Sequence, residues 1–374
     1  MIEDNFELEF EADPNDAIYN ASHWKLMWMR FRKHKLAMIG VVIVIFMYTL
    51  ALFAEFIAPN DPNFTSSQYS YRPPQRIRII DSEKNWHWPF VYGLKQARDP
   101  VTLRLNYVED TSVRVPISLF VRGSEYTAWG RVEGNLHLFG TKDGPWFPLG
   151  TDRLGRCILS RIIYGARIST TIGLVGVLLS FVFGLILGGI SGFYGGAVDI
   201  VVQRITEFLS SMPQIPLWMA LSAALPANLP PLQMYFGITI ILSLFAWTGL
   251  ARVVRGKFLS LRQEDFVMAA TLSGTSNAKI IRRHLIPTFT SHIIAQITLS
   301  IPAMIIGETS LSFIGVGLRP PTISWGVLLR EAQNLRTISQ APWLLIPGLF
   351  IIATVLAFNF MGDGLRDAAD PYSQ

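Results

Sequence analysis

Residues 265–288 read DFVMAATLSGTSNAKIIRRHLIPT, and this stretch lies between two long apolar runs of the chain. Its first part predicts a short helix that stops at Gly274 and whose apolar residues are Phe266, Val267, Ala270 and Leu272. Thr275 or Ser276 can cap a second helix, which carries Ile280, Ile281 and the basic group Arg282, Arg283 and His284. Pro287 then opens the next apolar run. The stretch therefore predicts two short helices at an angle, held between two membrane-length segments.

The composition of the whole chain supports a membrane setting for this stretch. Half of the 374 residues are apolar and 16% are charged, which favours a polytopic membrane protein over a soluble domain. The formal charge of +5 could suggest nucleic acid, but in a membrane chain Lys and Arg collect in cytoplasmic loops. A single cysteine, Cys157, excludes an internal disulfide and any multi-cysteine metal site. The first sixteen residues are acidic, so we expect no signal peptide.

Windows of about 20 largely apolar residues give the candidate membrane spans. Pro213 and Pro216 interrupt the third of them, although membrane helices tolerate proline where neighbours satisfy the freed carbonyls. The fold class expected is an all-α polytopic membrane protein with six transmembrane helices, at 36–58, 168–193, 205–225, 234–254, 288–314 and 343–360.

The orientation follows from the basic residues, which are concentrated before the first span and between the fourth and fifth. Both segments belong in the cytoplasm, and with six spans the two termini do as well. The domain boundaries expected are a cytoplasmic N-terminal segment (1–35), a first helix (36–58), an extracytoplasmic insert (59–165), a membrane core (166–362) with a cytoplasmic loop at about 252–287, and a cytoplasmic tail (363–374).

The insert has its own pattern. Residues 60–100 are rich in proline and aromatics, whereas VTLRLNYV (101–108), SVRVPISLFVRG (112–123) and NLHLF (135–139) alternate or run apolar as short strands do. We expect a small β-containing unit that either contacts a partner or acts as a spacer on the membrane domain.

Small residues recur at steps of four along the second span, at Gly176, Ser180, Gly184, Gly188, Gly192 and Gly196. At 3.6 residues per turn this row drifts by only about 40° per step and forms one slowly winding groove. Such a groove lets another helix approach closely, so Gly184, Gly188 and Gly192 are candidate packing residues. Packing within the chain is favoured over a contact between subunits.

Several kinds of catalytic chemistry have no motif in this chain. No phosphate-binding loop, HExxH, GxSxG or metal-spaced Cys/His set occurs, so neither an ATPase site nor a cofactor is expected. Intramembrane charge is scarce as well, with Glu308 as the main exception. Ion-coupled carriers usually place ionisable residues or broken helices at the membrane midplane, which argues against a secondary transporter or channel, although the broken third span keeps that alternative open.

The 265–288 stretch shares its outline with a helix-turn-helix DNA reader. The apolar runs on both sides leave too little tether to place it in a major groove, so no nucleic-acid partner is expected. A cytoplasmic projection on a protein without its own energy source is most simply a docking site for a separate ATPase.

The residues of this stretch resemble the EAA loop of ABC importer permeases, in which a short coupling helix docks into a cleft of the ATPase subunit. The similarity is carried by Ala269, Ala270, Gly274 and the ending His284-Leu285-Ile286-Pro287. Met268 stands where the family has the glutamate that names the motif. The resemblance implies a coupling role for Asp265, Met268, Ala269, Ala270, Gly274, His284 and Pro287, with Ala270 in the tightest part of the contact.

Other segments resemble one branch of this family, the C-type permease subunits of dipeptide and oligopeptide importers. They are MRFRKHKLAMIGVVIVIFMYTLALFAEFIAPNDP (29–62), LGTDRLGRCILSRIIYGARIST (149–170), GFYGGAVDIVVQRITEFLSSMP (192–213), GETSLSFIGVGLRPPTISWGVLL (307–329) and MGDGLRDAADP (361–371). Cys157 replaces the aspartate usual after Arg156, which predicts the loss of a structural salt bridge. The insert is longer than in typical members.

The resemblance implies a permease subunit in the inner membrane of a prokaryote, without an ATPase site of its own. Its implied partners are a second, homologous permease subunit, two ATP-binding subunits and an extracytoplasmic substrate-binding protein, besides the lipid bilayer. Peptides are the cargo expected, with opines, oligosaccharides and nickel chelates as alternatives. A membrane-anchored scaffold whose insert binds a partner is the remaining alternative class.

Overall fold

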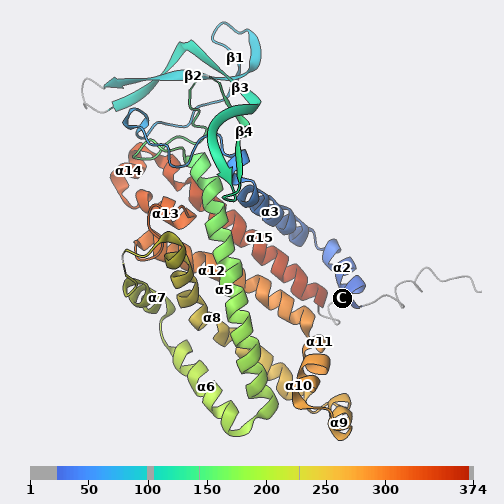
Figure 1. The fold of residues 1–374 in the computed structure, drawn as a ribbon. Coiled ribbons are helices and arrows are strands. Elements are labelled where there is room, and N and C mark those ends of the chain that lie inside the picture. Colours follow the sequence, from blue (N-terminus) through green and yellow to red (C-terminus); the bar gives the residue numbers. More distant parts are fainter. Residues whose placement is uncertain (1–22, 99–104, 143, 227, 370–374) are drawn as a thin grey trace, which may run out of the picture.

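The computed structural model of the protein describes residues 23–98, 105–142, 144–226 and 228–369. Long helices form one elongated body, and a β-sheet stands at one end of it (Figure 1). Within the described residues, the helices long and apolar enough to cross a membrane are α3 (Lys35–Leu52), α5 (Ile158–Tyr194), α8 (Pro231–Leu261), α12 (Thr290–Ile314) and the stretch Pro342–Ala369.

The ends of these helices follow local sequence rules. Pro231 lies in the first turn of α8, where its missing N–H costs no hydrogen bond. Gly315 ends α12 with a φ of +94°, the left-handed conformation that favours glycine. Shorter helices connect the long ones: α2 (His23–Lys33), α4 (Ala54–Ile57), η1 (Ser67–Tyr69), α6 (Gly196–Ser211), α7 (Gln214–Ala223), α9 (Asp265–Leu272), α10 (Asn277–Ile280), η2 (Ile281–Leu285), α11 (Ile286–Thr288), α13 (Trp325–Leu329), η3 (Arg330–Gln333), α14 (Leu335–Gln340) and η4 (Pro342–Leu345), which leads into α15 (Ile346–Ala369).

The third expected span, 205–225, is not one helix. The structure has α6 and α7 there, separated at Met212 and Pro213. Met212 is extended, with a ψ of 139°, because a following proline ring disfavours the α conformation. Neither piece is among the long apolar helices, so the count of six spanning helices is not confirmed.

α5 and α8 run side by side in the same direction. A Cβ built on Gly184 would lie 2.9 Å from Leu250 Cβ, on Gly188 2.4 Å from the Ala251 carbonyl oxygen, and on Gly192 2.7 Å from the Arg255 carbonyl oxygen. The Ser243 hydroxyl of α8 also donates to the Gly176 carbonyl of α5 at 3.0 Å. The glycine groove therefore packs against another helix of the same chain, with backbone in contact with backbone.

The main core lies where α3, α5, α8, α12 and α15 meet, and α13 closes one end of it. Trp325 of α13 is fully buried, and its ring N–H donates to the Ile162 carbonyl of α5 at 3.0 Å. α15 lies between α3 and α12 and also contacts α2.

The insert holds one antiparallel sheet in the order β1-β2-β3-β4, made of β1 (Arg78–Ile80), β2 (Trp86–Arg98), β3 (Leu105–Ala128) and β4 (Val132–Thr141). The expected strands at 112–123 and 135–139 are present. Residues 105–108 of the expected strand 101–108 belong to β3, and 101–104 lie outside the described residues. One half of β3 pairs with β2 and the other with β4, which gives the bent, extended sheet of Figure 1.

Candidate functional site

The 265–288 loop contains the two short helices expected, joined at Gly274. Gly274 has a φ of +74°, in the left-handed region that favours glycine. A Cβ at this position would meet no atom within 4 Å, so the requirement for glycine is conformational rather than steric. Ser276 precedes α10 in an extended conformation, but its side chain makes no capping hydrogen bond.

Buried side chains fix the loop to two long helices. Val267, Ile280 and Leu285 are almost fully buried. They form one cluster with residues of α8 and α12 and with Phe289 between the loop and α12, namely Leu250, Val254, Phe258, Phe289 and Ile293. The loop is therefore a packed extension of α8 and α12, and a force on it is passed to both helices.

The opposite face of α9 presents large apolar side chains to the outside. Leu272 is 89% exposed and Met268 49%, and Phe266, 41% exposed, lies at the side of the helix because it precedes Met268 by two positions. Asp265 and Ala269 are exposed too, whereas Ala270 is half-buried against the cluster of the loop itself. Ala270 thus faces inward, and the outward surface is formed by its neighbours Ala269, Met268 and Leu272.

The second half of the loop includes a widened turn. The Ile286 N–H donates to the Ile281 carbonyl across five residues, the π-helical pattern, directly before Pro287. His284 lies in this turn and is partly exposed. A hollow beside it is lined by Ser276, Ala278, Lys279, Arg282, Arg283 and Pro287, so the loop has a basic flank beside its apolar surface.

An ion pair that the sequence did not predict ties the neighbouring helix ends together. Asp199 of α6 accepts two hydrogen bonds from the Arg255 guanidinium of α8, at 2.5 and 2.6 Å, and one from the Ser191 hydroxyl of α5. The hydrogen bonds from Arg255 lower the pKa of Asp199 to about 2. Local sequence patterns do not predict this pair, because its charged partners are 56 positions apart.

A second charged network lies at the other end of the long helices. Asp152 pairs with Arg161 and, at 2.6 Å, with Arg156, which also pairs with Glu331 at 3.1 Å. Burial raises the pKa of Glu331. Cys157 is fully buried at the start of α5, and burial likewise raises the pKa of its thiol. Arg156 thus has carboxylate partners, so the salt bridge expected to be lost with aspartate at position 157 is replaced by others.

Glu308 lies in the interior of the helical body. It is fully buried, and its Oε1 accepts hydrogen bonds of 2.8 Å from the hydroxyls of Ser312 and Ser324. The Ser324 hydroxyl is also close to the Val327 N–H at the start of α13. Glu308 therefore connects α12 with the segment that closes this end of the core.

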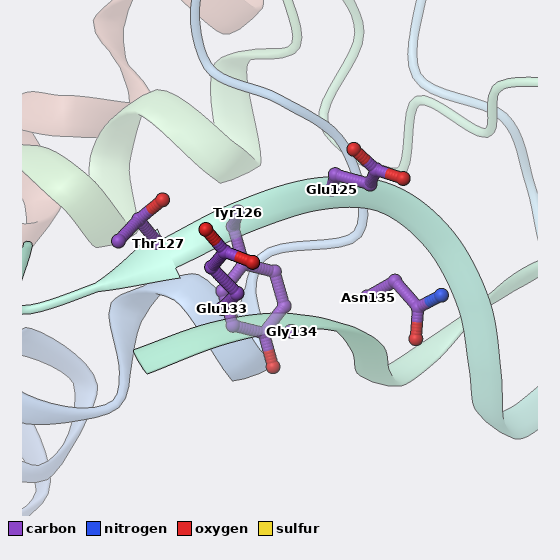
Figure 2. Close-up of a pocket in the computed structure, with 6 residues that line it drawn as sticks. All are labelled: Glu125, Tyr126, Thr127, Glu133, Gly134 and Asn135. Carbon is purple, nitrogen blue, oxygen red and sulfur yellow. The ribbon is translucent and has the colours of Figure 1, made fainter. Parts of the chain in front are cut away.

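The insert carries an open hollow on the β3–β4 hairpin, lined by Glu125, Tyr126, Thr127, Glu133, Gly134 and Asn135. Figure 2 shows the Tyr126 ring lying across Gly134, where a Cβ would come within 2.9 Å of the ring. Two carboxylates make this hollow acidic. In the part of the chain that the structure describes, no three His, Cys, Asp or Glu side chains are grouped to hold a metal ion.

Comparison with known proteins gives relatives along most of the chain. It is 31% identical to the dipeptide transport system permease protein DppC of Bacillus subtilis, over 92% of this chain and 84% of that protein. It is 30% identical to the oligopeptide transport system permease protein OppC of the same organism, over 94% and 90%. Among solved structures, an inward-facing MetNI methionine ABC transporter covers 56% of this chain and 97% of its own, with 18% identity and a TM-score of 0.44.

Two families match separate parts of the chain. Residues 22–74 match the N-terminal transmembrane domain of oligopeptide transport permease C. Residues 181–372 match the family described as binding-protein-dependent transport system inner membrane component, and this match includes α8, the 265–288 loop and α12.

Proposed function

Since the chain belongs to the family of binding-protein-dependent transport system inner membrane components, we propose that it forms one half of a heterodimeric membrane pathway that imports peptides. The relatives named for dipeptide and oligopeptide transport support this cargo. Opines, oligosaccharides and nickel chelates stay as alternatives.

The observation that carries the proposal is the outward face of α9. Exposed Met268 and Leu272 stand on a helix whose other side, at Val267 and Ala270, joins the cluster formed with α8 and α12. A soluble surface rarely concentrates large apolar side chains in this way unless a partner covers them. We assign this face to the ATPase subunit, which binds the ATP, so the chain itself acts as a transport subunit and not as an enzyme.

The helix directions support six crossings. α5 and α8 are parallel, so the chain between them must return to the side where α5 began. We assign that return to α6 and α7 together, as a broken third crossing. The basic segment before α3 and the 265–288 loop then lie in the cytoplasm together with both termini, as the positive-inside rule requires, and the insert lies outside.

The remaining partners follow from this arrangement. A second permease subunit completes the pathway, and an extracytoplasmic binding protein delivers cargo on the side of the insert and α13. Function therefore depends on an assembly in the inner membrane of a prokaryote.

Leu272→Asp tests the coupling assignment, with Leu335→Asp as its matched control. Both leucines are very exposed, 89% and 82%, so neither change costs buried contacts, but Leu335 lies on α14 at the other end of the molecule. With the second permease and both ATPases co-expressed, we expect Leu272→Asp to weaken ATPase co-purification by about thirtyfold, the loss of an interface side chain worth about 2 kcal/mol. Leu335→Asp should leave it unchanged. Normal ATPase capture by Leu272→Asp would remove the coupling role.

A further inference from the structure

The tip of the β3–β4 hairpin lies beside the last turn of α3 (Figure 1). The Trp129 ring N–H donates to the Leu52 carbonyl oxygen at 3.0 Å, and the Trp129 ring is 6.4 Å from that of Phe53. A second ring contact joins Phe120 of β3 to Phe56 of α4, with centroids 6.3 Å apart. These contacts fix the hairpin at a defined level along the first long helix.

That level is the edge of the bilayer. α3 has 18 residues, which at 1.5 Å per residue span about 27 Å, close to the thickness of the hydrocarbon core. Basic Arg30, Arg32 and Lys33 precede the helix and mark one boundary. Leu52 and Phe53, at its end, therefore lie at the opposite boundary, and Trp129 lies beside them.

The face of α3 that the hairpin touches is typical of a lipid contact. Its exposed residues are large, as at Ile45 and Phe46, and Leu52 and Phe53 follow these by seven positions, which places them on the same face. The buried face has small residues, and a Cβ on Gly40 would lie 2.5 Å from the Ala357 carbonyl oxygen of α15. Helices in membranes pack through small residues, so the face with large residues fits lipid better than a second helix.

The hairpin adds its own apolar surface at the same place. The exposed fractions are 61% for Leu119, 60% for Phe120, 54% for Trp129 and 55% for Val132. Exposed Arg122 and Arg131 stand among them. Tryptophan with neighbouring arginine is the combination expected at the level of lipid headgroups.

The backbone of the hairpin holds both aromatic residues in an unusual conformation. Trp129 and Gly130 have φ values of +51° and +67°, the sign pattern of a type I′ turn, whose first central position favours asparagine or glycine over a bulky ring. Phe120 also has a positive φ, +54°. Such strain in bulky residues points to a role for the rings themselves.

We propose that the tip of the β3–β4 hairpin inserts into the interfacial layer of the bilayer on the insert's side, with Trp129, Phe120 and Val132 among the lipid headgroups and upper acyl chains. The acidic hollow at Glu125 and Glu133 stays on the aqueous part of the hairpin. The insert is thereby anchored to the membrane at two points, its connection to the long helices and this tip. The proposal requires that α3 spans the bilayer and does not depend on the cargo or on the coupling loop.

Cysteine labelling tests the insertion directly, because Cys157 is buried and an added cysteine is the single accessible thiol of the chain. Val132→Cys and the control Trp86→Cys are each labelled with an environment-sensitive fluorophore in the assembled transporter in nanodiscs. Trp86 is 78% exposed and starts β2, where it pairs with Ile80 of β1. Figure 1 shows β1 and β2 on the part of the insert away from α3. Lipids with a spin label high on the acyl chain should quench most of the Val132→Cys emission and leave that of Trp86→Cys unchanged. Equal quenching at the two positions would overturn the proposal, as would cross-linking of Val132→Cys to the second permease or the binding protein in place of quenching.

Trp129→Asn separates anchoring from folding. Asparagine suits the turn better than tryptophan, so the hairpin should fold, but the ring that reaches the interface is lost. In the Val132→Cys background we expect Trp129→Asn to remove most of the lipid quenching while transporter yield stays unchanged. Full quenching in this double variant would show that the ring does not anchor the tip and would refute that part of the proposal.

Discussion

Replacing Gly188 by alanine adds one methyl group where α5 meets α8. The new Cβ would lie 2.4 Å from the Ala251 carbonyl oxygen and 2.8 Å from its Cα. Both atoms are backbone, so no side-chain rotation can relieve the clash. Since heavy atoms prefer contacts of about 3.5 Å, the helices must separate locally by about 1 Å.

Two opposing terms set the size of the effect. Overpacking of well-packed helices costs about 1–3 kcal/mol, and contacts with backbone place the cost in the upper part of this range. Alanine in place of glycine in a helix offsets about 1 kcal/mol of this. We therefore expect Gly188→Ala to destabilise the chain by about 1–2 kcal/mol.

Gly249→Ala is the matched control, because a Cβ on Gly249 of α8 would meet nothing within 4 Å. It carries the same helix gain of about 1 kcal/mol without the clash, so it should stabilise the chain. Thermal unfolding of the purified chain in detergent, followed by intrinsic fluorescence, should rank the variants as Gly249→Ala, parent, Gly188→Ala from most to least stable. If the melting temperature of Gly188→Ala equals or exceeds that of Gly249→Ala, the contact between α5 and α8 accommodates the extra methyl group and the packing argument fails.

Four further outcomes follow from the same structure. Asp199→Asn should lose about 1–2 kcal/mol at neutral pH. The folded pKa of Asp199 is about 2 and its unfolded value about 3.9, so the parent keeps this stabilisation above pH 4 and loses it as the pH falls toward 2. A difference in unfolding free energy between the parent and Asp199→Asn that stays constant from pH 7 to pH 2 would contradict the ion pair. Glu308→Gln keeps an acceptor oxygen for both serine hydroxyls and should fold normally, whereas Glu308→Ala leaves two buried hydroxyls without it and should lower the melting temperature clearly. Gly274→Ala should cost about 1–2 kcal/mol in loop stability through its positive φ alone, while Gly256→Ala, in an open helical site, should cost nothing, as measured by hydrogen exchange of the loop. A disulfide between facing positions of α5 and α8 should leave transport intact, and a cross-linked transporter that stops would show that the two helices slide.

Apolar windows predicted the long helices, and small-residue spacing predicted that α5 packs closely against another helix of the chain, because both depend on local composition. The identity of that helix, α8, was not predicted. The predicted start of α5, residue 168, was wrong, because the helix begins at Ile158. Arg161 and Arg167 interrupt the apolar window, but Asp152 pairs with the first and Glu55 binds the second with two hydrogen bonds of 2.8 Å. These carboxylates lie outside the apolar window, so a hydropathy window does not include the pairing that lets the two arginines lie in the helix.

The insert shows the same limit for strands. β3 and β4 alternate visibly and were predicted, but β1 and β2 were not. Pro89 and Gly93 lie inside β2, and both residue types are typical of turns, so the sequence did not indicate a strand there. In the sheet, Gly93 lies at a shift in register between β2 and β3. Within the 265–288 loop, helical spacing did not reveal that Ala270 faces inward and Leu272 outward, because the side chains that decide this come from α8 and α12.

The contacts of α8 determine how a displacement of the loop can travel. Leu250, Val254 and Phe258 hold the loop, and the same stretch of α8 lies against the Gly184–Gly192 row of α5. Sliding of one helix along the other would drive the side chains beside these glycines into the opposite backbone, since the two helices are already in close contact there. A push on the loop therefore moves α5 and α8 together as one body.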